Sequence, residues 1–421
     1  MLRELNISVN NFFSFDEVLK IKNLNFFPFQ MTSSISSNDQ NLKASNTNVG
    51  NDILNRKLKV IISGGGTGGH IFPAIAIANA LKNLVPNIEI LFVGAEGRME
   101  MEKVPAAGYK IEGLWISGLQ RKLTIDNLSF PFKVISSINK SRNIINKFKP
   151  DVVIGVGGYA SGPLLYVAAN KGIPTLIQEQ NSYPGITNKV LAKRVNKICV
   201  AYPGMDKYFP KEKIILTGNP VRQDILDIAN KREDALKFFG LNNTKKVLLV
   251  IGGSLGARTI NQSMKAGLDA LCKNNIQVIW QTGKSFYNEA KNATNKFEQS
   301  GIKVYDFINR MDYAYAATDV VISRAGASSI SELSLVGKPS ILVPSPNVAE
   351  DHQTKNTMAL VNNNAAILIK DSEAKDILIR RVIELLKEDA EQSKLRNNIG
   401  KIALKDSANV IANEILMLVK K

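Results

Sequence analysis

The sequence has only two cysteines and two histidines among its 421 residues. Cys199 and Cys272 lie far apart in apolar segments, which excludes a disulfide framework and a thiolate zinc site and predicts buried thiols in a reducing compartment. The chain also lacks any run of 18 apolar residues, so we expect no membrane-spanning helix. With 44% hydrophobic and 22% charged residues, its composition is typical of a soluble globular protein.

Acidic residues are too few to balance the basic ones, and the net charge is +17. Residues 58–218 alone contain ten more basic than acidic side chains. Such an excess predicts an anionic partner: nucleic acid, an anionic membrane surface or a phosphorylated substrate. A nucleic-acid-binding protein would show clustered basic and aromatic residues in a known module, and none is visible, so we expect no nucleic acid partner.

Residues 1–57 lack periodic hydrophobicity and are rich in Asn and Ser, which predicts a disordered N-terminal extension. From Leu58 onward, apolar runs of four to six residues end in glycine loops and alternate with amphipathic segments, as in βαβ units with a buried parallel sheet. The predicted strands lie at 58–63, 88–94, 151–157, 174–179, 197–201 and 213–218, and at 246–253, 276–283, 302–307, 319–326, 339–344 and 365–369.

A Gly-Asn-Pro turn near residues 216–225 separates the two sets of strands. We therefore predict an α/β protein of two domains, 58–220 and 221–421, each a doubly wound parallel sheet. Ligands of such sheets bind beyond the carboxyl ends of the strands. The cleft between the two domains is the expected active site.

Three glycine loops follow predicted strands, at 64–70, 155–163 and 252–258. Backbone N–H groups and a helix N-terminus bind anions at such loops, although glycines in the same places could simply make tight turns. No P-loop motif is present. Gly64, Gly66 and Gly69 fit the dinucleotide pattern, but the strand at 88–94 lacks an acid at its end, which disfavours a dinucleotide-dependent oxidoreductase without removing that alternative.

The glycine loops occur in order with further motifs: QEQNSYPG at 178–185, TGNPVR at 217–222, SRAGASSISEL at 323–333 and DHQTKNT at 351–357. Together these seven motifs resemble the bacterial glycosyltransferase family usually called MurG, which attaches N-acetylglucosamine to lipid I. The resemblance covers about residues 58–421 and implies a GT-B fold, two Rossmann-like domains facing a cleft, with the last helix packing back on the first domain. A related transferase that makes membrane glycolipids from UDP-sugars stays open, because only the acceptor distinguishes it.

The resemblance implies transfer of GlcNAc from UDP-GlcNAc to the C4 hydroxyl of MurNAc in lipid I, with inversion, to give lipid II for peptidoglycan synthesis. Many nucleotide-sugar enzymes neutralise the departing diphosphate with a metal held by a D-x-D motif, and this sequence has none. We therefore expect no metal and no cofactor. The diphosphate would be held by backbone N–H groups, a helix N-terminus, Ser254 and Arg222.

His70 follows the first glycine loop and is our candidate for the general base, because a neutral imidazole accepts a proton near pH 7. Alternatively, it only bonds the loop at the start of a helix. The family comparison assigns Gln353 to the hydroxyls of the donor sugar, Glu332 to the ribose and the backbone of Ile308 to the uracil. It places Ala327, Ser328, Ser329, Ile330 and Ser331 in the nucleotide pocket, Ser254 at a phosphate, Asn181 near the transferred sugar, and Thr67, Gly68 and Gly69 in the first loop. His352 matches no required position, so we expect it on the surface.

The resemblance implies that the acceptor is a membrane lipid, which would explain the basic first domain. Between Gly113 and Asn143, aromatic and aliphatic residues alternate with cations, a pattern that suits attachment to an anionic membrane surface. The predicted membrane patch comprises Trp115, Leu119, Arg121, Lys122, Phe130, Phe132 and Lys133. Aromatic residues at this spacing also occur in protein cores. The expected location is the cytoplasmic face of the bacterial inner membrane. The expected partners are the substrates UDP-GlcNAc and lipid I, and proteins of cell-wall synthesis.

Overall fold

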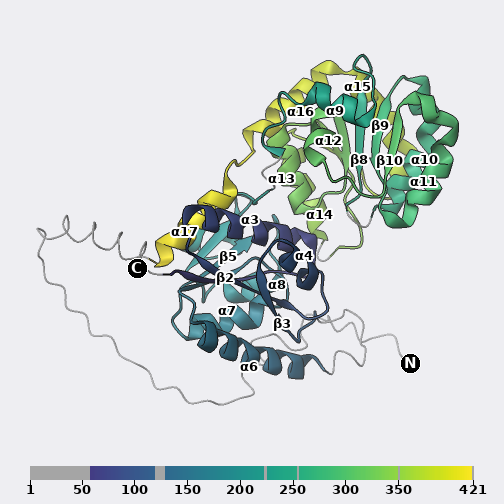
Figure 1. The fold of residues 1–421 in the computed structure, drawn as a ribbon. Helices are drawn as coiled ribbons and strands as arrows, with labels where there is room; N and C mark the ends of the chain where they lie inside the picture. Colours follow the sequence, from purple (N-terminus) through teal and green to yellow (C-terminus); the bar gives the residue numbers. More distant parts are fainter. Residues whose placement is uncertain (1–56, 119–128, 222–224, 254–255, 349–350, 420–421) are drawn as a thin grey trace, which may run out of the picture.

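The computed structural model describes residues 57–118, 129–221, 225–253, 256–348 and 351–419, and these form two α/β domains (Figure 1). The predicted extension up to residue 56 lies outside the described residues, as do five predicted site residues. These five are Leu119, Arg121, Lys122, Arg222 and Ser254.

The first domain is built on a seven-stranded sheet with the order β3-β2-β1-β4-β5-β6-β7, and all neighbouring strands are parallel. Its strands are β1 (Lys59–Ser63), β2 (Glu89–Ala95), β3 (Lys110–Leu114), β4 (Val152–Gly155), β5 (Thr175–Glu179), β6 (Lys197–Val200) and β7 (Ile214–Leu216). Its helices are α3 (Gly68–Leu84), α4 (Glu100–Ala106), α6 (Phe130–Phe148), α7 (Ser161–Asn170) and α8 (Ile186–Leu191), with short 3-10 turns at Met205–Lys207 and Lys211–Lys213. The central strands are runs of Val and Ile because helices cover both faces of the sheet.

The second domain is built on a six-stranded parallel sheet with the order β10-β9-β8-β11-β12-β13. Its strands are β8 (Val247–Ile251), β9 (Gln277–Gln281), β10 (Ile302–Tyr305), β11 (Val320–Ser323), β12 (Ser340–Leu342) and β13 (Ile367–Leu368). Its helices are α9 (Arg232–Phe239), α10 (Arg258–Lys273), α11 (Tyr287–Thr294), α12 (Met311–Ala317), α13 (Ala327–Val336), α14 (His352–Val361), α15 (Ala374–Lys387) and α16 (Asp389–Lys401), with 3-10 turns at Lys284–Phe286 and Asn295–Ser300. The predicted fold class, two Rossmann-like parallel-sheet domains, is confirmed.

Strand order reverses between β1 and β4 in the first sheet and between β8 and β11 in the second. Loops that leave neighbouring strands in opposite directions open a crevice at such a switch point. The glycine loops after β1, β4 and β8 therefore lie where this fold binds ligands.

The last helix, α17 (Ser407–Val419), packs on the first domain although it follows the second in sequence. Ile411 and Ile415 are fully buried in the same core cluster as Val60 and Ile71. Figure 1 shows α17 lying beside α3. The chain thus crosses between the domains a second time before it ends.

The two cysteines differ in their burial. Cys199 on β6 is fully buried, and burial raises the pKa of its thiol to about 12, so it is an unreactive core residue. Cys272 is only half-buried, contrary to the prediction from its apolar surroundings. Both are free thiols.

Candidate active site

The first two glycine loops pack directly against each other at the carboxyl edge of the first sheet. The N–H of Gly65 donates to the carbonyl of Gly157 over 3.3 Å. A Cβ atom at Gly158 would lie 2.6 Å from the carbonyl oxygen of Gly65, and the backbone of Gly158 has a φ of +91°. Only glycine allows both this close approach and this backbone conformation.

His70 lies in the first turn of α3, held against these loops. Its Nδ1 atom is 2.9 Å from the carbonyl oxygen of Gly65. Because a carbonyl only accepts hydrogen bonds, Nδ1 must carry the proton, which leaves Nε2 of the neutral ring as the acceptor. The Nε2 edge of the ring faces Gly157, where an added Cβ would lie 2.9 Å from Nε2.

Burial lowers the pKa of His70 from its ordinary value of 6.5. The hydrogen bond to Gly65 and the carboxylates of Glu179 and Glu100 raise this pKa, but their effect is smaller than that of burial. The neutral form therefore predominates at pH 7. The positive charge that His352 can carry also lowers the pKa of His70. His352 begins α14 and is half-buried, so it lies partly at the surface.

Glu100 at the start of α4 holds the first glycine loop. Its fully buried carboxylate accepts hydrogen bonds from the N–H of Gly66 over 2.8 Å and of Ala95 over 3.0 Å. A phosphate cannot use the N–H of Gly66 while this bond is in place. The first turn of α3, with Thr67, Gly68 and Gly69, is the remaining part of the loop that can meet an anion.

A second buried carboxylate, Glu179 at the end of β5, shapes the next loop. It accepts hydrogen bonds from the N–H groups of Asn181 at 3.0 Å and Gly185 at 3.1 Å, and from the side chain of Asn188 at 2.8 Å. These bonds fix the loop that carries Asn181.

Asn356 on α14 joins this loop to the second domain. Its amide donates to Oδ1 of Asn181 over 3.0 Å and accepts from the N–H of Ser182 over 2.9 Å. Asn356 is fully buried, and α14 also carries Gln353. The predicted residues Asn181 and Gln353 are thus brought to the same region by a residue that was not among the predictions.

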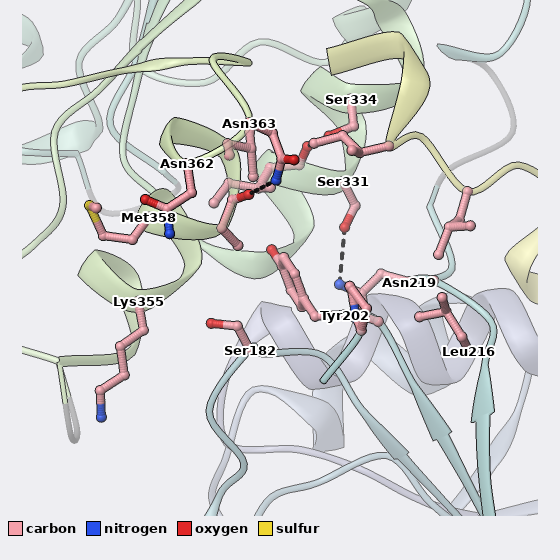
Figure 2. Close-up of a pocket in the computed structure, with 18 of the residues that line it drawn as sticks. Ser182, Tyr202, Leu216, Asn219, Ser331, Ser334, Lys355, Met358, Asn362 and Asn363 are labelled. Carbon is pink, nitrogen blue, oxygen red and sulfur yellow. Dashed lines mark hydrogen bonds between the residues drawn. The ribbon is translucent and has the colours of Figure 1, made fainter. Parts of the chain in front are cut away.

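A chain of amides makes a second connection between the domains. Asn219 donates to the carbonyl of Gln180 over 2.9 Å and accepts from Gln178 over 2.8 Å. It also donates to the hydroxyl of Ser331 over 3.0 Å (Figure 2). Gln180 in turn donates to the carbonyl of Val156 over 2.7 Å. The network therefore runs from the second glycine loop to helix α13.

Helix α13 begins at Ala327, shortly after β11 ends at Ser323, and its Ser331 contacts Asn219 of the first domain. The Oγ atom of Ser328 is buried and has no hydrogen-bond partner among the described residues. Buried hydroxyls are normally paired, so an unpaired one at a helix N-terminus suits a bound anion. Ser329 and Ile330 lie in the same turn, with Ile330 buried.

Two further predicted donor contacts already have partners within the protein. The N–H of Ile308 donates to Oε1 of Gln281 over 2.9 Å, and Gln281 donates to the carbonyl of Gly253 over 3.2 Å. A uracil base could therefore bond to the carbonyl of Ile308. It could bond to the N–H of Ile308 only if Gln281 turned away. The Oε1 atom of Gln353 accepts from the N–H of Ser345 over 2.8 Å, which directs its amide NH2 to any sugar hydroxyl.

Glu332 is held by the hydroxyl of Tyr315, which is fully buried and donates to Oε2 over 2.9 Å. Replacing Tyr315 by Phe should raise the KM for the expected donor, UDP-GlcNAc, by about three- to tenfold, because a net hydrogen bond is worth about 0.5–1.5 kcal/mol. The kcat should stay unchanged if Glu332 binds the ribose. Steady-state kinetics would measure both, with Tyr313→Phe on the same helix as the control, and an unchanged KM would contradict the role of Glu332.

On the outer surface of the first domain, Trp115 is 48% exposed and Phe132 is 69% exposed. Lys133 lies 5.7 Å from the centre of the Trp115 ring. Ile135, on the same helix as Phe132, is also exposed. Phe130 differs from the prediction, because it is half-buried and packs against the core of the domain.

Among the residues that the structure describes, no group of three or more His, Cys, Asp or Glu side chains is arranged to hold a metal ion. Within the same residues, no helix is long and apolar enough to cross a membrane.

Comparisons with known proteins agree with this geometry. Residues 60–200 match the glycosyltransferase family 28 N-terminal domain, and residues 247–413 match the family 28 C-terminal domain. A protein of Parabacteroides distasonis is 56% identical over 87% of this chain and 100% of its own length. Its name is UDP-N-acetylglucosamine–N-acetylmuramyl-(pentapeptide) pyrophosphoryl-undecaprenol N-acetylglucosamine transferase. The chain belongs to this family of glycosyltransferases.

A protein of the same name from Phocaeicola vulgatus is 57% identical over 87% of this chain and 98% of its own length. Among solved structures, that of Acinetobacter baumannii MurG superposes with a TM-score of 0.71 at 26% identity, covering 86% of this chain and all of the other. The family membership removes the oxidoreductase alternative.

Proposed function

We propose that this protein transfers GlcNAc from UDP-GlcNAc to the C4 hydroxyl of MurNAc in lipid I, giving lipid II. The observation that carries the proposal is the identity of 56% with the Parabacteroides distasonis transferase over that protein's whole length. Two features support it: the neutral His70 on the first domain, and a helix start with an unpaired buried hydroxyl on the second, which would suit an anion.

The reaction needs one displacement. Nε2 of His70 takes the proton from the C4 hydroxyl, and the oxygen attacks the anomeric carbon of GlcNAc from the face opposite the diphosphate. The bond between the anomeric carbon and the β-phosphate oxygen breaks, and its electron pair leaves with UDP. The configuration at the anomeric carbon is therefore inverted.

The charge of the departing diphosphate would be met by the first turn of α13, with the unpaired hydroxyl of Ser328, and by the start of α3. Glu332 would accept hydrogen bonds from the ribose, and the amide of Gln353 would donate to a hydroxyl of the sugar. Asn181 would lie near the transferred sugar because Asn356 draws its loop towards α14.

We propose that this charge stabilisation needs no metal, since the sequence has no D-x-D motif. Adding an excess of EDTA should leave the initial rate of transfer unchanged within about twofold. The assay would follow labelled GlcNAc into lipid, with a metal-dependent glycosyltransferase as the positive control. Loss of activity in EDTA that Mg²⁺ restores would contradict this part of the proposal.

The acceptor would be reached from the cytoplasmic face of the inner membrane. We propose that Trp115 and Phe132 enter the interface while Lys133 meets anionic headgroups, because exposed aromatic groups beside cations favour peripheral attachment.

Changing Phe132 to Glu should weaken binding to phosphatidylglycerol vesicles by about tenfold or more, because one buried aromatic side chain contributes about 1.5–3 kcal/mol and the new charge is repelled. Vesicle flotation would measure the bound fraction. Phe238→Glu is the matched control, since Phe238 is a similarly exposed phenylalanine on the second domain. Equal binding by the two variants would rule out this patch.

The activity is tested by supplying labelled UDP-GlcNAc with either a short-chain lipid I analogue or diacylglycerol. Transfer to the lipid I analogue alone supports the proposal. Transfer to diacylglycerol instead would favour a glycolipid-forming transferase, which differs only in its acceptor.

A further inference from the structure

A cavity of about 700 Å³ lies between the domains (Figure 2). Its walls are formed by residues at the ends of β6 and β7 in the first domain, and by α13, α14 and the segment after α16 in the second. Two residues predicted for the nucleotide pocket, Ile330 and Ser331 on α13, line this cavity. Neither His70 nor Gln353 lines it. Its size is within the range of small-molecule binding sites.

Tyr202 extends from the first domain into this cavity, toward the end of α14 where Asn362 and Asn363 lie (Figure 2). Its hydroxyl is buried and has no hydrogen-bond partner among the described residues. Leaving a buried hydroxyl unpaired costs stability, so a polar ligand atom would be favoured there. Burial raises the pKa of Tyr202, so the hydroxyl keeps its proton and can donate to an anion.

The rest of the lining mixes apolar side chains with hydroxyl and amide groups and with three lysines, Lys207, Lys355 and Lys401. Leu216, Met358 and Ile402 contribute to the apolar walls. Lys207 and Lys401 are exposed; the Nζ atom of Lys207 lies 5.3 Å from the centre of the Tyr208 ring, and that of Lys401 donates to Oδ1 of Asn398 over 3.4 Å. None of the described lining residues is acidic. The cavity thus combines apolar wall segments, a buried hydrogen-bond donor and positive charge that no described acidic lining residue balances.

We propose that this cavity binds an amphipathic anion, an aliphatic or aryl body with one phosphate or carboxylate group. The apolar walls would hold the body, Tyr202 would donate to the head group, and the lysines would attract its charge. Because both domains form the walls, the shape of the cavity depends on the distance between the domains. A bound ligand would therefore stabilise one arrangement of the domains and influence the opening of the cleft.

Octyl phosphate is a suitable probe for the intact chain. Calorimetric titration in the presence of saturating UDP should show binding to one site, while inorganic phosphate and octanol should each bind at least about tenfold more weakly, since each lacks one half of the recognised chemistry. Displacement by UDP would place the probe in the donor site and overturn the proposal. If octanol bound as tightly as octyl phosphate, the cavity would not recognise the anionic group, and this result would also overturn the proposal.

Two variants locate the site. Tyr202→Phe and the double variant Lys207→Gln/Lys401→Gln should each raise the Kd for octyl phosphate by about fivefold or more. Lys394→Gln is the matched control, because Lys394 is exposed on the same helix as Lys401 but does not line the cavity. Unchanged affinity in both variants would overturn the assignment. The titration requires no transfer of sugar, so its outcome is independent of the proposed reaction.

Discussion

Replacing His70 by alanine is expected to lower the kcat for GlcNAc transfer by about 10²–10⁴-fold, the usual contribution of a general base. The hydrogen bond from Nδ1 to Gly65 leaves Nε2 as the proton acceptor, and no other group is invoked for that step. Affinity for UDP-GlcNAc should change little, because the donor contacts are proposed for the second domain. Steady-state kinetics and donor titration together would separate the two effects.

The pH dependence provides a second readout. Burial lowers the pKa of His70 below 6.5, so the base is neutral at pH 7 and becomes protonated only as the pH falls through that lowered value. The kcat/KM of the unaltered protein should therefore fall on the acid side, and the His70→Ala variant should lack this decline. Near-normal turnover, or an unchanged acid limb in the variant, would contradict the assignment.

The second large effect is expected at Gly157, which is not itself proposed to touch a substrate. A Cβ atom there would lie 2.7 Å from Cδ2 of His70, so alanine must displace the imidazole ring. The residue also has a φ of +93°, a backbone conformation that costs a non-glycine residue about 1–2 kcal/mol. Gly157→Ala should therefore lose about 10²-fold or more in kcat, approaching the His70 variant, as well as some stability.

Gly172→Ala distinguishes these two consequences. Gly172 has a similar φ of +71°, but an added Cβ would meet nothing within 4 Å. It should lose stability in thermal unfolding yet keep its turnover. If Gly157→Ala behaves like Gly172→Ala, the second glycine loop does not position His70.

Much of the architecture was predictable because it depends on local pattern. All twelve predicted strands are present, since buried parallel strands are runs of Val and Ile that end in glycine. The strand β3 was missed because Lys110–Leu114 has the sequence KIEGL, in which only Ile111 and Leu114 are apolar. This edge strand therefore lacks the continuous apolar run by which the other strands were predicted.

The grouping of Gly64 to His70 at one place was predictable because a single loop carries these residues. The site was not predictable where the contact joins distant parts of the chain. Glu100 looked like an ordinary acid at a helix start, yet its carboxylate holds Gly66, 34 residues away. Asn356 and Asn219 lay inside recognised motifs, but their bonds to the opposite domain depend on how the domains meet.

The central claim is that Nε2 of His70 accepts the proton of the C4 hydroxyl of MurNAc while the hydroxyl oxygen attacks the anomeric carbon of GlcNAc. It is tested most directly by incubating the protein and its His70→Ala variant with UDP-GlcNAc and a lipid I analogue, and determining the product by NMR. The account predicts a disaccharide linked at C4 with the β configuration, inverted from the α-linked donor, and almost none from the variant. Retention of the α configuration, linkage at another hydroxyl, or equal product from both proteins would contradict it.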